Sequence, residues 1–90
     1  MPKYVIEREM PGAGNMTMEE KQDGARKSNA VIDGLGAQIE WIHSYITPDK
    51  IYCIYLAPNK ETIQQHAEMS GFPADRIEEV CALIDPTSAN

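Results

Sequence analysis

Two histidines and one glutamate are the side chains of this sequence most suited to binding a metal ion. His43 lies in an apolar and aromatic stretch, and His66 lies near the apolar stripe of a later helical segment. Neutral imidazole binds borderline metal ions near neutral pH, and the carboxylate of Glu7 offers a compatible oxygen donor. The histidines lack a local metal-binding spacing such as HxH or HExxH, and taken singly each is more typical of a structural residue. A metal site would therefore have to be assembled by the fold or between two copies of the chain.

The other reactive residue types lack the surroundings that catalysis needs. Cys53 and Cys81 form no CxxC pair, and neither lies in a motif or a basic segment that would activate a thiol. We expect two unlinked thiols that pack as small apolar residues. The glycine-containing loop at residues 11–14 has no lysine or arginine and fits neither a P-loop nor GxGxxG, which favours a plain connector. The sequence therefore predicts no catalytic residue and no organic cofactor.

Length and charge indicate the number of domains and exclude some classes of partner. Ninety residues predict a single domain over residues 1–90. The 14 acidic and 8 basic residues give a net charge of −6, which repels nucleic-acid phosphates and anionic lipid surfaces. The sequence has no apolar run long enough for a signal peptide or a membrane span. We therefore expect a cytoplasmic protein with neither nucleic acid nor membrane as a partner.

Hydrophobic periodicity and turn residues predict four strands and two helices. The strands are expected over residues 3–9, 38–46, 50–57 and roughly 77–84. A capping box formed by Thr17 and Glu20 begins the first helix, and the glycines of residues 34–36 end it. Asn59 caps a second helix over residues 60–70, which stops at a glycine followed by proline. The order of elements is β-α-β-β-α-β.

This order defines the expected architecture. Right-handed crossovers place the first and third strands at the centre of a four-stranded antiparallel sheet, with both helices on one face. The arrangement is the ferredoxin-like α+β sandwich. A symmetric hairpin pairs Ser44 with Cys53 and Ile42 with Tyr55 on the helix side. It leaves an uncovered face that carries Trp41, His43, Tyr45, Tyr52, Ile54 and Leu56.

An aromatic and aliphatic face of this kind is too apolar to remain in water. We expect it to be the core of a face-to-face homodimer interface. The alternative is a cavity lined by the same rings, in which His43 and Glu7 are the polar members.

Several stretches of the sequence together resemble a known family. The most specific are Trp41-Ile42-His43-Ser44-Tyr45 and Gly71-Phe72-Pro73-Ala74. They are similar to those of small bacterial domains that were long of unknown function and are now associated with nickel binding. The resemblance covers nearly the whole chain and implies a ferredoxin-like fold, a dimer and a role in nickel binding or response. It places His43 and His66 at the family's histidine positions and Glu7 at an acidic one, and it implies no catalytic residue.

Three functions follow as hypotheses. The first is a dimeric nickel-binding protein with histidine and carboxylate ligands. The second is an enzyme of the dimeric α/β-barrel kind, a small monooxygenase or isomerase that uses an aromatic cavity and His43. The third is a structural module whose apolar face only dimerises. Bound metal favours the first, a deep pocket that contains His43 favours the second, and a flat, dry interface favours the third.

Overall fold

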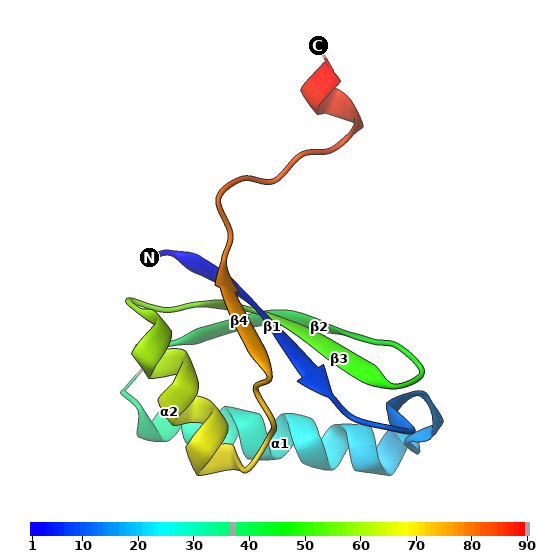
Figure 1. The fold of residues 1–90 in the computed structure, drawn as a ribbon. Helices are drawn as coiled ribbons and strands as arrows, with labels where there is room; N and C mark the ends of the chain where they lie inside the picture. The colour runs from blue at the N-terminus through cyan, green and yellow to red at the C-terminus, as the bar shows by residue number, and fades with distance from the viewer. Residues whose placement is uncertain (37, 90) are drawn as a thin grey trace.

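A computed structural model describes residues 1–36 and 38–89 of the chain. Its elements follow the predicted order, with two short 3-10 turns added (Figure 1). The strands and helices are β1 (Lys3–Glu9), η1 (Ala13–Asn15), α1 (Met18–Gly34), β2 (Glu40–Ile46), β3 (Lys50–Leu56), α2 (Lys60–Ser70), β4 (Arg76–Glu79) and η2 (Pro86–Ala89).

The four strands form one antiparallel sheet in the order β2-β3-β1-β4, so the prediction of β1 and β3 as central strands is confirmed. Both helices lie on the same side of this sheet (Figure 1). Alternate strand residues, among them Ile6 and Tyr55, are buried beneath the helices, where Ile63 of α2 completes the core. The opposite face of the sheet carries no helix, and the fold is the ferredoxin-like α+β sandwich.

Local signals in the sequence set the ends of both helices. The Thr17 hydroxyl accepts a hydrogen bond from the Glu20 backbone, and the Glu20 carboxylate accepts one from the Thr17 backbone, as a capping box requires. The Asn59 side chain accepts from the Thr62 amide at the start of α2. Gly71 ends α2 with a φ of 75°, a left-handed conformation that glycine adopts without a steric penalty.

A β-bulge in β2 corrects the predicted face of Trp41. The hairpin pairs Ser44 with Cys53 as expected, but one extra residue lies between Trp41 and His43, so Trp41 pairs with Tyr55. Because side chains alternate along a strand, one inserted residue moves every earlier residue to the other face. The expectation that Trp41 lies on the open face is therefore wrong. Its indole lies on the helix side and donates to the Ser44 hydroxyl at 3.0 Å.

The last strand is shorter than predicted because its partner ends. Glu79 pairs with Tyr4, and the Val80 amide donates to the Lys3 carbonyl at 2.8 Å, beyond which β1 offers no further strand residues. The chain then leaves the sheet and projects away from it (Figure 1). Leu83 and Ile84 are 72% and 83% exposed in this segment.

Both cysteines are free thiols, which confirms that no disulfide joins them. Cys53 is buried in the core as expected. Cys81 is exposed in the segment that follows β4, so its predicted apolar packing is wrong.

Candidate functional site

The open face of the sheet is organised in rows that cross the strands. In one row His43 of β2, Ile54 of β3 and Val5 of β1 lie side by side. In the next row the neighbours are Tyr45, Tyr52 and Glu7. Each row is built by register alone, because directly paired residues point to the same face of a sheet.

The part of this face that β2 and β3 form is largely apolar and accessible, whereas the part on β1 and β4 carries charged side chains such as Glu7, Arg76 and Glu78. Tyr45 is 59% exposed, and His43 is also exposed. The rings of His43 and Tyr45 meet edge to face, with centroids 4.9 Å apart. Tyr52, Ile54 and Leu56 are half-buried among their neighbours on β3. The structure therefore places five of the predicted interface or cavity residues together and moves only Trp41 away; the interface itself stays a prediction.

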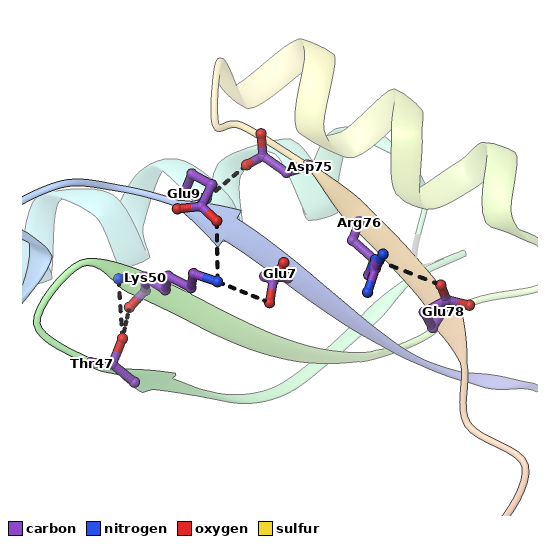
Figure 2. Close-up of polar contacts among 7 residues, drawn as sticks. All are labelled: Glu7, Glu9, Thr47, Lys50, Asp75, Arg76 and Glu78. Atoms are coloured by element: carbon purple, nitrogen blue, oxygen red, sulfur yellow. Dashed lines mark hydrogen bonds and ion pairs between the residues drawn. The ribbon is translucent and has the colours of Figure 1, made fainter.

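Glu7 lies on the same face, but its carboxylate has a partner already. The Lys50 ammonium lies 3.5 Å from Glu7 Oε1 and 3.2 Å from Glu9 Oε1 (Figure 2). The hydrogen bond to Glu9 and the charge of Glu7 raise the pKa of Lys50 above its ordinary value. Lys50 thus remains charged and competes with any metal ion for the Glu7 carboxylate.

Glu40 is a further carboxylate on this face, and the residue pattern of β2 does not indicate its position. It pairs with Leu56, one row from His43, and is exposed. The same bulge that turns Trp41 inward places Glu40 on the open side. The residue types of β2 do not indicate a bulge. The position of Glu40 near His43 therefore follows only from the register that the structure shows.

His66 lies on the other side of the sheet, within the core. It has no exposed surface, and its Nε2 is 3.1 Å from the Ser28 hydroxyl oxygen of α1. Its ring packs against Tyr55 with centroids 5.2 Å apart, and its Nδ1 has no hydrogen-bond partner. The sheet itself therefore separates His66 from His43 and Glu7.

Burial of His66 makes the stability of the fold depend on pH. Burial, with a contribution from the Arg8 charge, lowers the pKa of His66 below its ordinary value of 6.5. The unfolded chain then takes up a proton at a higher pH than the folded one does. The contribution of His66 to the free energy of unfolding is therefore fully present above pH 6.5 and falls below it, by up to about 1.4 kcal/mol per pH unit, until the folded pKa is reached.

Urea unfolding between about pH 5 and pH 8 measures this effect. We expect His66→Gln to flatten the decline, because the amide keeps a partner for Ser28 and does not titrate. His43→Gln is the matched control and should keep the decline of the wild type. Equal pH profiles for wild type and His66→Gln would contradict the assignment.

The donors of one chain do not by themselves fit a nickel ion. Among residues 1–36 and 38–89, no three His, Cys, Asp or Glu side chains lie close enough to share a metal. His43 is exposed and available, Glu7 is held by Lys50, and His66 is sealed in the core. A complete site would need donors from a second molecule.

Comparison with known proteins now assigns the family. The model of the family described as nickel responsive protein SCO4226-like matches residues 4–80. The chain belongs to this family. Its structure is also similar to the crystal structure of SCO4226 from Streptomyces coelicolor A3(2), with a TM-score of 0.77 and 22% sequence identity. That match covers 91% of this chain and 99% of the other and supports the shared fold, while no curated protein matches the sequence.

Membership in the nickel responsive family agrees with the resemblance seen in the sequence. The structure adds two features that were not predicted from the sequence: the carboxylate of Glu40 beside His43, and a buried arginine, Arg8, beneath the helices. Arg8 has the same parity on β1 as Tyr4 and Ile6, and this alternation is the signal that indicates its burial. None of the helices among the described residues is both long and apolar enough to span a bilayer.

Proposed function

We propose that this chain acts as a homodimer that binds nickel on the open face of its sheet, with His43 as the principal ligand. The observation that carries the proposal is the position of His43, an exposed imidazole on an uncovered sheet face rich in aromatic and aliphatic side chains. The family's description as nickel responsive supports the choice of metal.

The surface around His43 favours pairing of two sheets. An uncovered sheet face with Tyr45, Tyr52, Ile54 and Leu56 has the composition of an interface core. A domain of 90 residues has a thin core and gains stability from a partner. An isologous dimer brings the same patch of both molecules together. The surface that needs covering is thus the surface that carries the metal donor.

Dimerisation would also supply the metal-donor atoms that one chain lacks. A two-fold axis doubles every donor on the face, so two imidazoles and at least two carboxylates become available. Nickel accepts imidazole nitrogen and carboxylate oxygen in tetragonal or octahedral geometry. Glu40 is the nearer carboxylate in register and has no ion-pair partner among the described residues, whereas Glu7 must first leave Lys50.

The position of the cavity argues against an enzyme built around His43. The pocket on the helix side of the sheet is lined by residues such as Trp41 and Tyr55 and does not include His43. The hypothesis of a monooxygenase or isomerase with His43 in an aromatic cavity therefore finds no support in the part of the chain that the structure describes.

Untagged protein that has been stripped of metal tests the proposal directly. We expect sedimentation equilibrium at micromolar concentration to give twice the 10.0 kDa chain mass. We expect calorimetry with nickel chloride to show saturable binding, which magnesium chloride does not reproduce because magnesium prefers oxygen ligands. A monomer at these concentrations would contradict the dimer, and the absence of nickel binding would contradict the metal assignment.

A further inference from the structure

A cavity of about 400 Å³ lies between α1 and the helix-covered face of the sheet, away from the open face. Its volume is within the range of small-molecule sites. Most of its lining is apolar and comes from the first half of α1, the loop before it, and β2 and β3. The apolar lining includes Met10, Met16, Trp41, Ile46, Ile51 and Phe72.

Two small residues of α1 leave the space open. Gly24 and Ala25 both line the cavity in the middle of the helix. A Cβ added at Gly24 would meet no atom within 4 Å, so no close approach of another segment requires a glycine there. Glycine is unfavourable inside a helix relative to alanine, and nothing in the packing compensates for it. The effect of Gly24 is to widen the cavity.

A buried cation lines the same cavity. Arg8 is only 2% exposed. Its Nη1 donates to the Pro73 carbonyl, its Nε lies 3.4 Å from Cys53 Sγ, and its guanidinium carbon lies over the Phe72 ring, 5.7 Å from the ring centroid. The third nitrogen, Nη2, is buried without a hydrogen-bond partner. No carboxylate of the described residues forms an ion pair with Arg8.

A buried charge that lacks both a counter-ion and a full set of hydrogen bonds is strongly unfavourable. Arg8 is nevertheless buried, because it lies on the same face of β1 as Tyr4 and Ile6, and that face is covered by the helices. A guanidinium binds a planar oxyanion with two parallel hydrogen bonds, and a carboxylate has the matching geometry. The unpartnered Nη2 of Arg8 is therefore a donor that would suit an anion.

We propose that this cavity binds an amphipathic organic carboxylate, with its anionic group on Arg8 and its apolar part between α1 and the sheet. The Ser28 hydroxyl and the Glu20 carboxylate of the lining are already hydrogen-bonded within the protein. Two cations then line the cavity, and we assign the anchor to Arg8 because it is buried, whereas Lys21 is exposed to water. The apolar lining selects an aliphatic or aromatic tail, because its burial removes apolar surface from water. This site is separate from the proposed nickel site, so either can be wrong without the other.

Trp41 gives a direct readout, since it lines the cavity and is the single tryptophan of the chain. Decanoate and decanol are probes with the same tail and different head groups. We expect decanoate to change the emission of Trp41 and to bind at least tenfold more tightly than decanol. Decanoate should also raise the melting temperature, because a ligand that binds only the folded state stabilises it.

Two variants separate the roles of the charge and the space. Arg8→Met should remove the tenfold preference for decanoate, because the cation that remains in the lining, Lys21, is exposed to water and its charge is screened. Replacement of an unpaired buried charge by an apolar side chain is compatible with a stable fold. Gly24→Leu should fill the cavity and weaken both probes at least tenfold, with Arg8 intact.

Comparison of the two probes in the wild type decides the proposal even if Arg8→Met fails to fold. Equal affinities for decanoate and decanol would overturn it, as would the absence of any decanoate binding. Retention of the decanoate preference in a folded Arg8→Met protein would also overturn it.

Discussion

Replacement of Ile54 by glutamate is expected to convert the proposed dimer into monomers at micromolar concentration. Ile54 lies between His43 and Val5 in one row of the open face, at the centre of the surface that pairing would bury. An uncompensated charge buried in an interface costs about 3–5 kcal/mol, and a two-fold interface would contain two of them. We expect association to weaken by at least two orders of magnitude, roughly tenfold for each 1.4 kcal/mol.

Sedimentation equilibrium of wild type and Ile54→Glu measures this change. Leu83→Glu is the matched control, because Leu83 is equally apolar but lies in the exposed segment beyond β4. It should leave the mass of the dimer unchanged. If Ile54→Glu stays dimeric with the affinity of the wild type, the open face is not the interface.

Alanine at His43 is expected to weaken nickel binding at least tenfold. His43 is the one imidazole on the open face among the described residues, and both copies of it in a dimer would be lost. The fold of the single metal-free chain should change little in stability, because His43 is exposed in it and substitutions at such positions have small effects, usually within about 0.5 kcal/mol.

Titration calorimetry on untagged protein gives the affinities, and thermal unfolding in EDTA gives the stability. His66→Gln is the control variant. It should bind nickel with the affinity of the wild type, because His66 lies beneath the sheet with no exposed surface. Glu40→Gln and Glu7→Gln then identify the carboxylate, and we expect the larger loss from Glu40→Gln. Equal nickel affinities of wild type and His43→Ala would exclude His43 as a ligand.

The fold was largely predictable because its signals are local. The capping box of Thr17 and Glu20 and the glycine at residue 71 are read from a few neighbouring residues, and the structure contains each of them. The hairpin turn set the pairing of Ser44 with Cys53 in the same way. Chain order and crossover handedness then leave one arrangement of four strands and two helices.

The parts of the candidate site that sequence did not predict depend on contacts between distant segments. The bulge that moves Trp41 and Glu40 is an irregularity of pairing between β2 and β3, and the composition of β2 alone does not indicate it. The burial of Arg8 depends on which face of β1 the helices cover, and charged residues are rarely buried in this way. The separation of His66 from His43 likewise appears only once the helix side and the open side are known.

The bulge in β2 has a further consequence for how copies of this protein meet. In the order β2-β3-β1-β4, the strands β2 and β4 are the free edges, where another chain could add a strand and begin aggregation. The bulge interrupts the regular ladder of β2, and β4 is only four residues long, three of them charged. Both features are known protections of sheet edges. They disfavour growth from edge to edge, whereas the proposed pairing of two broad faces would close after two molecules.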